Sequence, residues 1–477
     1  MQNAPKRRDR REMQNAPKRR DRRDTPLGMT RSVCPECRQL VDAHIVERRG
    51  RIVMRTWCPD HGWTEALVSS DAKQYRDARR FARPGSMPIH VERDFHGCPD
   101  SCGLCTEHEQ HTCLALMEIT QACQLDCPVC FAGPSAGGGH LSLAQIDAMM
   151  ERLLACEGEP ESLQLSGGEP TLHPQILEIL RLAEGKGFRR ILLNTNGVRL
   201  AEDPAFLDAV SEFDPTIYLQ FDGLEDATYE TLRGRALADL KLRLVDMLAE
   251  RELRTVLVAT VVRGVNEHEL GALVDFALAQ RHVRCLTLQP ATFAGRFAPA
   301  LPVAATDPMD RVTLADCARL IAAQSRHGFK KADFFPIPCP DPACSLVTYV
   351  HTGADPETGE ERVLPLTRLA DAEDYVDFVK NASAGELNSE LREVFDEFIA
   401  AGAAADRTAA CSCSSCGGVS VDWGALELEI TLIGMMHFMD EHTFDLSRLR
   451  KCCVHEVLPD DGGIVPFCAY NVLHRGR

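Results

Sequence analysis

Hydrophobic and polar positions follow a regular order through the middle of the chain. Between residues 114 and 290, short aliphatic and β-branched runs alternate with longer amphipathic stretches. The short runs predict β-strands and the amphipathic stretches predict α-helices, because each follows the period of that structure. The predicted strands cover 114–120, 161–166, 190–195, 216–221, 255–262 and 284–289. The predicted helices cover 142–155, 174–187, 203–212, 236–252 and 267–280.

This alternation predicts the fold class of the core. Strands that alternate with helices form parallel sheets with right-handed crossovers. The six predicted strands are too few for a complete eight-stranded barrel. We therefore predict an α/β fold in which residues 114–330 form a partial (β/α)6 barrel of the TIM type. Residues 291–330 would add a further helical crossover, and the alternation stops after them.

The segments outside the core have other patterns. Residues 1–28 contain a duplicated basic sequence without an apolar face, which predicts a disordered arm. Met29 is an alternative start, and the arm's charge is also compatible with contact to an anionic membrane surface. Residues 29–75 predict a small zinc-ribbon or rubredoxin-like metal module. Residues 76–113 predict an auxiliary Fe–S segment, and residues 331–477 a C-terminal Fe–S extension.

Composition narrows the class of protein. The chain has 477 residues, a formal net charge of −17 and 21 cysteines. The negative charge argues against nucleic acid as a partner. The N-terminus lacks the apolar segment of a secretory signal, and no stretch approaches the ~20 apolar residues that span a bilayer. Closely spaced cysteines in such a chain predict metal binding in the reducing cytoplasm rather than disulfides.

The central cysteine motif follows the first predicted strand. Cys123, Cys127 and Cys130 form a C-x3-C-x2-C loop. Three thiolates can hold a [4Fe–4S] cluster while one iron stays open to another ligand. The loop lies at the C-terminal end of a strand, where barrels of this type place their active sites. A structural cluster or a zinc site is the alternative interpretation.

Polar turns follow the next three predicted strands. They are SGGEP with Gly167, Gly168, Glu169 and Pro170, NTNG with Asn194 and Asn196, and QFDG with Gln220 and Asp222. The C-terminal ends of parallel strands meet at one face, so these turns and the cysteine loop would share a mouth. Glycines permit close approach of the backbone, and a carboxylate can bind an ammonium group. These turns would therefore face the cysteine loop, and the resemblance described next implies that they form a cofactor-binding surface.

The cysteine loop and the SGGEP turn together resemble the radical S-adenosylmethionine (SAM) superfamily. The resemblance implies that the three cysteines hold a [4Fe–4S] cluster, that SAM binds its open iron and that the glycine-rich turn contacts the SAM amino group. It implies an enzyme that reductively cleaves SAM to a 5′-deoxyadenosyl radical, which abstracts hydrogen from an unactivated C–H bond. Flavodoxin or ferredoxin would donate the electron. A non-enzymatic Fe–S carrier or scaffold is the alternative, against which SGGEP argues.

Further cysteines predict accessory metal sites. A C-x2-C pair and a C-x2-H pair predict a closed zinc site, with rubredoxin-type iron as the alternative, and supply Cys34, Cys37, Cys58 and His61. A second group predicts an auxiliary [4Fe–4S] cluster, with a second SAM site as the alternative: Cys98, Cys102, Cys105 and Cys113. The tail predicts another cluster from Cys339, Cys344, Cys453 and Cys468, with Cys453 preferred over Cys452. The roles of Cys411, Cys413 and Cys416 stay open.

The order of these modules is similar to one branch of the superfamily over residues 31–474. The tail contributes the motifs FMD, CVH and PFCAYN to this similarity. The branch contains an archaeal enzyme that methylates a dihydropterin, and synthases of tetraether and other membrane-spanning lipids. It implies C–C bond formation on a pterin-like small molecule or on lipid tails, and the residues do not separate the two. The apolar, Met-rich segment 430–439 could line a lipid channel, with core packing as the alternative.

Overall fold

The computed structural model describes residues 24–91, 97–99, 103–133, 138–297, 301–302, 306–354, 361–368, 371–373, 430–459 and 463–475. The predictions for residues 1–23, for Cys102 and for Cys411, Cys413 and Cys416 lie outside these ranges. Within them, no helix combines the length and the apolar character that crossing a membrane requires.

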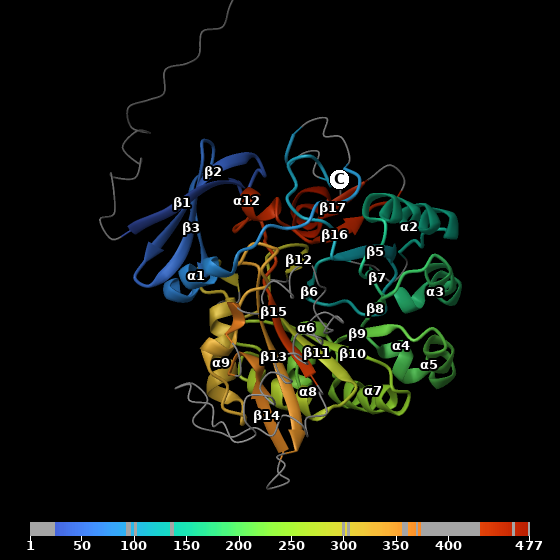
Figure 1. Ribbon diagram of the computed structural model, residues 1–477. Coiled ribbons are helices and arrows are strands. Elements are labelled where there is room, and N and C mark those ends of the chain that lie inside the picture. Colours follow the sequence, from blue (N-terminus) through green and yellow to red (C-terminus); the bar gives the residue numbers. More distant parts are fainter. Residues whose placement is uncertain are drawn as a thin grey trace, which may run out of the picture.

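The core is a curved, largely parallel sheet with helices on its outer side (Figure 1). Its central strands are β5 (Leu114–Thr120), β7 (Leu163–Gly167), β8 (Ile191–Thr195), β9 (Thr216–Gln220), β10 (Thr255–Val261) and β11 (Val283–Pro290). They are neighbours in this order, and every pair is parallel. The helices are α2 (Leu143–Glu157), α3 (Ile176–Gly185), α4 (Val198–Glu202), α5 (Pro204–Ser211), α6 (Asp226–Arg233), α7 (Ala238–Glu250), α8 (Leu270–Ala279) and α9 (Leu314–Gln324). The predicted partial (β/α)6 barrel is confirmed.

Side chains alternate between the two faces of each core strand. In β7, Leu163 and Leu165 are fully buried in the main hydrophobic core, which the helices share. Gln164 and Ser166 point to the other face and line a cavity inside the barrel. This alternation follows from the two-residue period of a strand. Polar residues in the core strands therefore collect on the inner face, where they are available to a ligand.

The region predicted as a C-terminal extension contributes strands to the core sheet. Strand β15 (Ile430–Met436) pairs in parallel with β11, and β16 (Val454–Val457) pairs in parallel with β5 at the opposite edge. Antiparallel strands β13 (Ser345–Ala354), β14 (Glu361–Pro365) and β17 (Ile464–Pro466) continue the sheet outward. An open barrel leaves unpaired backbone groups at both edges. The C-terminal strands satisfy those groups, which a local sequence pattern could not reveal.

Short elements complete the described chain. Strands β6 (Val129–Cys130) and β12 (Arg296–Phe297) pair next to the central cysteine loop. The remaining helices are α1 (Ala72–Ala78), α12 (Leu446–Leu449) and α13 (Phe467–Ala469), with a π-turn over Tyr470–His474. Single 3-10 turns cover Arg79–Phe81, Pro170–Leu172, Lys331–Asp333 and Leu366–Arg368.

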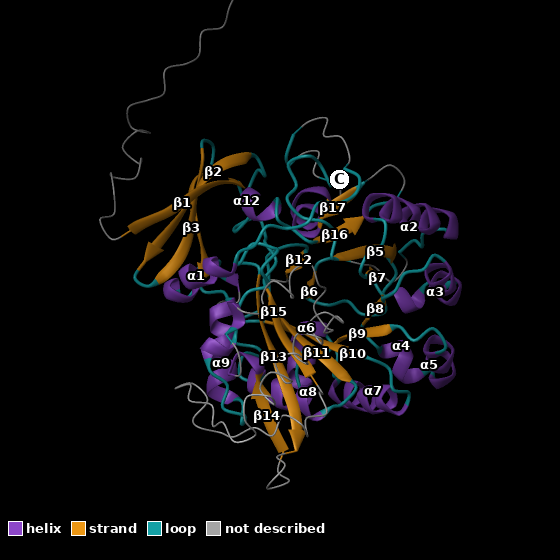
Figure 2. Ribbon diagram, viewed as in Figure 1, coloured by secondary structure: helices purple, strands orange, loops and turns teal. Residues whose placement is uncertain are grey.

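The N-terminal module is a four-stranded antiparallel sheet, shown apart from the helical layer in Figure 2. Its strands are β1 (Asp24–Val33), β2 (Leu40–Arg48), β3 (Arg51–Cys58) and β4 (Gly62–Ser69). The predicted disordered arm was therefore too long, because residues 24–28 belong to β1. The Asp24 carboxylate accepts two hydrogen bonds, of 2.6 and 2.7 Å, from Arg48. A chain that started at Met29 would lose this contact and half of β1.

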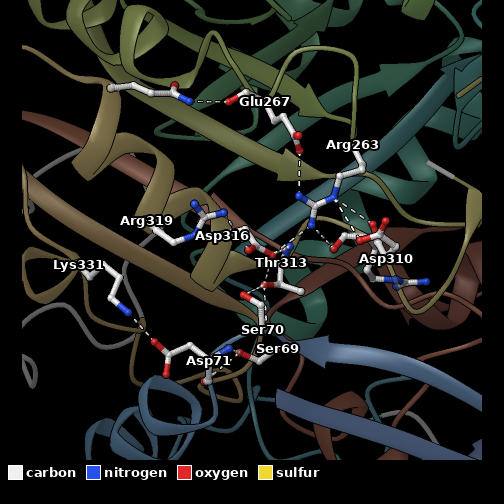
Figure 3. Close-up of polar contacts among 12 residues, drawn as sticks. Ser69, Ser70, Asp71, Arg263, Glu267, Asp310, Thr313, Asp316, Arg319 and Lys331 are labelled. Carbon is white, nitrogen blue, oxygen red and sulfur yellow. Dashed lines mark hydrogen bonds and ion pairs between the residues drawn. The ribbon is translucent and has the colours of Figure 1, made fainter. Parts of the chain in front are cut away.

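The module packs against the barrel near the start of α9 (Figure 3). The backbone N–H of Ser70 donates to Thr313 Oγ1 at 3.3 Å, and Lys331 Nζ pairs with an Asp71 carboxylate oxygen at 2.5 Å. Figure 3 also labels the polar residues around this contact: Arg263, Glu267, Asp310, Asp316 and Arg319. The N-terminal module (the ribbon, residues 24–70) thus lies on the outer side of the barrel, away from the inner cavity.

Candidate active site

A cavity of about 290 Å³ occupies the inside of the partial barrel. Cys123, Cys127 and Cys130 line it where the core strands end. Cys113 and Cys453 also line it, at the positions just before β5 and β16 begin. The cavity therefore extends between two groups of thiols that lie at opposite ends of the same strand, β5.

The loop with three cysteines is held close to the barrel mouth. Burial raises the pKa of Cys123 to about 12 and also raises the pKa of Cys127. Both thiols therefore hold their protons at neutral pH, and metal binding must displace these protons because thiolates are the ligands. Arg296 donates to the carbonyl of Cys127 at 3.3 Å and ties the loop to β12. Three thiols on one short loop, all facing the same cavity, suit a cluster with one open iron.

The two glycines after β7 allow the neighbouring loops to pack closely. Gly167 has a φ of +131°, and a Cβ there would overlap the carbonyl oxygen of Thr120. A Cβ at Gly168 would overlap the carbonyl oxygen of Ala122. The backbone N–H of Gly168 donates to Thr120 O at 2.8 Å. Both glycines line the cavity next to the cysteine loop, so their backbone groups are available there to a cofactor.

Glu169 connects two turns at the barrel mouth. Its carboxylate is 1% exposed and accepts hydrogen bonds from Thr171 Oγ1 at 2.6 Å, Thr195 Oγ1 at 2.7 Å and the backbone N–H of Asn196 at 2.7 Å. These contacts involve both carboxylate oxygens and join the turns after β7 and β8. The contact of Glu169 with the SAM amino group stays a prediction. Pro170, also buried, begins the 3-10 turn behind it.

The asparagines after β8 reach the cavity. Asn194 Nδ2 donates to Ser166 Oγ at 3.0 Å. Asn196 Nδ2 lies 3.8 Å from Cys123 Sγ, and its amide also contacts Gln124 at 3.2 Å. Both asparagines line the cavity, and their contact with a cofactor stays a prediction.

Asp222, predicted as a cofactor-binding residue, forms a buried ion pair with Arg233. It is fully buried and accepts two 2.7 Å hydrogen bonds from Arg233. Burial raises the pKa of this carboxyl, but the guanidinium beside it outweighs burial and lowers the pKa. Arg233 itself lines the cavity, donates to Val129 O at 3.1 Å and hydrogen-bonds the Cys127 thiol. Asp222 therefore positions Arg233 against the cysteine loop.

Lys241 on α7 is another buried residue that the sequence did not identify. Its Nζ donates to Asn196 O at 2.6 Å and to Gln220 O at 2.5 Å. It is fully buried, and burial lowers its pKa to about 7. The lysine joins the turns after β8 and β9, and Gln220 lines the cavity beside it. In the sequence, a lysine among the apolar inward positions of α7 was the one sign that this position has a special role.

The predicted ligands in the N-terminal module lie together. The ligand atoms of Cys34, Cys37, Cys58 and His61 all lie within 4.8 Å of one another. Cys37 Sγ and Cys58 Sγ are 3.8 Å apart, close to the separation of about 3.8 Å that two Zn–S bonds of about 2.3 Å give at tetrahedral angles. Burial raises the pKa of Cys58, but backbone hydrogen bonds from Asp60 and His61 bring it to about 7. This donor set fits zinc.

The remaining cysteines group differently from the prediction. Cys113, predicted with Cys98, Cys102 and Cys105, instead hydrogen-bonds through its thiol to Cys339 and Cys453. Strand pairing explains this, because Cys113 and Cys453 precede the neighbouring strands β5 and β16, and Cys113 N donates to Cys453 O at 2.9 Å. Spacing along the sequence could not reveal this pairing.

A second group of cysteines consists of Cys344, Cys452 and Cys468. Cys468 is buried, Cys344 and Cys452 are partly buried, and the three thiols interact electrostatically. Cys98 packs against the hydrophobic cluster that contains Cys468, and Arg448 donates to Cys344 Sγ at 3.3 Å. The predicted tail site of Cys339, Cys344, Cys453 and Cys468 is thus divided between two groups, and Cys452 belongs to one of them. Cys105 is buried.

Comparison with known proteins identifies the family of the barrel and of the N-terminal module. Residues 117–277 match the radical SAM superfamily, and residues 26–70 match the HMPTM N-terminal zinc ribbon domain. The chain is 30% identical to the 7,8-dihydro-6-hydroxymethylpterin dimethyltransferase of Methanocaldococcus jannaschii, over 94% of each chain. It is 29% identical to a probable GTP 3′,8-cyclase of Methanothermobacter thermautotrophicus, over 34% of this chain and 52% of the cyclase.

A solved structure gives a partial likeness. It is Streptococcus suis SuiB bound to S-adenosylmethionine, with 16% identity and a TM-score of 0.36, over 44% of this chain and 46% of SuiB. The full-length similarity to the archaeal dimethyltransferase and the superfamily match over the barrel agree with the cysteine loop at the barrel mouth. The chain belongs to the radical SAM superfamily, in the branch that contains the archaeal dihydropterin dimethyltransferase.

Proposed function

We propose that this chain cleaves SAM reductively and uses the resulting radical to form a carbon–carbon bond on a substrate held inside the barrel. The observation that carries the proposal is that Cys123, Cys127, Cys130 and the backbone of Gly167 and Gly168 all line one cavity. A cofactor bound at this mouth and a substrate deeper in the barrel would therefore share an enclosed space. Enclosure matters because it excludes water from a radical.

The chain's own residues prepare this site. When bound, a [4Fe–4S] cluster supplies an open iron for SAM and the electron for its cleavage. Asp222 and Lys241 hold the loops around the cluster site through Arg233 and the carbonyl of Asn196. Arg233 brings a positive charge to the Cys127 thiol, which favours thiolate over thiol. These residues fix the loop geometry that a positioned radical reaction requires.

The first candidate substrate is a dihydropterin-like heterocycle that receives a methyl group. Its support is the similarity over 94% of the chain to a dihydropterin dimethyltransferase. The cavity volume of about 290 Å³ lies near the lower end of the usual range for small-molecule sites. Its inner wall carries several polar side chains from the core strands, including Gln164, Ser166 and Asn194.

The second candidate reaction is the coupling of lipid tails. One observation favours it: a hydrophobic cluster of Leu116, Val454 and Phe467 lines the same cavity, and Met435 and Met436 line it as well. Methionine and aliphatic side chains suit a hydrocarbon chain. Strand β15, which covers most of segment 430–439, packs into the sheet and also contributes to the cavity wall, where a hydrocarbon chain would contact it.

Accessory metals complete the proposal. Zinc in the N-terminal module would be structural, because Cys34, Cys37, Cys58 and His61 fill all four positions. We assign one auxiliary Fe–S cluster to the Cys113, Cys339 and Cys453 group and a second to the Cys344, Cys452 and Cys468 group. A flavodoxin or ferredoxin would supply the electrons.

The test is an anaerobic assay of the full chain with reconstituted clusters, dithionite and SAM. We expect 5′-deoxyadenosine, with faster formation when 7,8-dihydro-6-hydroxymethylpterin is added, and a methylated product detected by mass spectrometry. A parallel assay with a long-chain glycerol ether lipid tests the second candidate. If neither substrate is consumed while deoxyadenosine forms, both substrate assignments are wrong and the radical chemistry stands.

A further inference from the structure

Gln164 differs from the other residues on the inner face of the barrel. Its side chain is 3% exposed, and its Oε1 accepts no hydrogen bond from any residue that the structure describes. Gln164 lines the cavity, because Leu163 and Leu165 on either side of it point into the helix-covered core. A buried amide oxygen without a partner is costly, so such a group in a ligand cavity indicates a ligand that completes it.

The neighbours of Gln164 cannot supply that partner. In the register of the sheet it lies between Leu116 of β5 and Leu192 of β8, and both of these leucines line the cavity. An amide flanked by two aliphatic side chains cannot exchange hydrogen bonds with them. The two leucines therefore leave the buried Gln164 amide oxygen without a partner, in a side chain that borders the cavity.

Aromatic rings border the same space. Phe131, Phe438 and Phe467 all line the cavity and form a mutual cluster with ring centroids 4.7–5.8 Å apart. Leu116, the neighbour of Gln164, packs in this cluster. Phe131 directly follows Cys130, so the rings extend from the cysteine loop toward Gln164. Rings at these distances provide surfaces that favour a flat aromatic ligand.

We infer that Gln164 and the aromatic cluster form a subsite for a planar ring that carries a cyclic amide edge. The inference rests on the proposed function and deepens it. A primary amide offers an acceptor and a donor side by side, which matches the N–H and C=O groups of a ring lactam in two parallel hydrogen bonds. A dihydropterin has this edge and a flat ring. A hydrocarbon tail has neither, and it would leave the Gln164 amide unpaired.

The test is equilibrium binding of 7,8-dihydro-6-hydroxymethylpterin to the anaerobic, cluster-reconstituted full chain with SAM present. We expect Gln164→Leu to weaken binding about 10–100-fold, because the substitution keeps the size but removes both hydrogen-bonding groups. Gln164→Glu keeps the shape and replaces the donor with an acceptor, so it should also weaken binding. The matched control is Gln175→Leu, the same change at an exposed position that precedes α3. Iron content and SAM affinity should stay at wild-type values in all three variants.

Each outcome has a defined meaning. Wild-type pterin affinity in Gln164→Leu would overturn the subsite and leave the proposed substrate in place. Failure of the wild-type chain to bind the pterin, with binding of a glycerol ether lipid that Gln164→Leu does not weaken, would overturn both the subsite and the pterin assignment. The SAM chemistry would survive that second outcome, because deoxyadenosine formation measures it separately.

Discussion

The N-terminal ribbon and the barrel loop both present cysteines next to strand ends, but they differ in number and in setting. In the ribbon, four ligand atoms lie within 4.8 Å of one another, between strands of a small antiparallel sheet. In the barrel, the loop after β5 brings only Cys123, Cys127 and Cys130 to the mouth of a cavity of about 290 Å³.

This difference separates a structural metal site from a reactive one. Four protein ligands fill a tetrahedral metal and leave no position for a substrate. Three ligands on a cubane cluster leave one iron available, and the cavity gives that iron access to a second molecule. Ligand count and access to a cavity therefore distinguish the two functions, although both sites are built mainly from thiols.

The largest effect is expected from removing a ligand in the barrel loop. Cys127→Ala should lower the rate of 5′-deoxyadenosine formation by at least about a thousandfold, since SAM cannot be cleaved without the cluster. Chromatography of the reaction measures this rate. Zinc content, measured by mass spectrometry of the metal, should stay unchanged because the ribbon is separate. Formation of deoxyadenosine at the wild-type rate would show that the barrel loop is not required for SAM cleavage.

Removing a ligand of the N-terminal metal site should change the zinc content and leave SAM cleavage nearly unchanged. Cys58→Ala should release the zinc and lower the thermal stability of the ribbon, because binding energy at a structural metal is folding energy. Deoxyadenosine formation should stay within about threefold of wild type, or about 0.65 kcal/mol in the barrier. Metal analysis and a thermal melt provide the readouts. Loss of SAM cleavage together with intact barrel iron would show that the ribbon takes part in the reaction.

Substitution of Arg233 tests whether the Asp222–Arg233 ion pair stabilises the barrel wall next to the cysteine loop. Arg233→Met should destabilise the chain by about 3–5 kcal/mol, because it leaves the buried Asp222 carboxylate without its partner. Arg235→Met is the matched control: Arg235 is 51% exposed and pairs with Glu202 at 3.5 Å, so its loss should cost less than about 1 kcal/mol. Denaturant melts of the two variants measure the difference. Equal stabilities would contradict the positioning role of Asp222.

Glu169 should show a smaller effect, mainly on stability. Glu169→Gln places an amide NH2 or a weaker acceptor opposite the donors Thr171, Thr195 and Asn196, and should cost about 1–3 kcal/mol. A denaturant melt measures this cost. SAM affinity in the folded variant should change by less than about fivefold, since the carboxylate does not face the cavity. A larger loss of SAM affinity at unchanged stability would indicate that Glu169 contacts SAM directly, as the sequence predicted.

The sequence predicted the barrel better than its surroundings. Period-two runs and amphipathic stretches identified the six core strands, because each pattern is local and is set by burial. The C-terminal strands β15 and β16 were missed as barrel strands, since their partners β11 and β5 lie far away in the sequence. The predicted grouping of the cysteines differs from the structure for the same reason. Cys113 and Cys453 meet through strand pairing, which the spacing along the sequence does not encode.

Residue type predicted which positions matter, but not what each one does. Glu169 and Asp222 were identified correctly as polar residues at strand ends. Their contacts to Thr195 and Arg233 decide that they position loops, and these contacts depend on the turns of neighbouring strands. The ribbon ligands were predicted as one set, because all four lie within two short motifs.

The central claim is that the barrel loop binds the cluster that cleaves SAM, and one experiment tests it directly. The wild-type chain and a Cys123→Ala, Cys127→Ala, Cys130→Ala triple variant are reconstituted, reduced and mixed with SAM without oxygen. We expect 5′-deoxyadenosine from the wild-type chain and none above background from the triple variant, in which any iron bound by the proposed auxiliary groups should remain. Equal deoxyadenosine from both proteins would contradict the account and move the SAM site to another cysteine group.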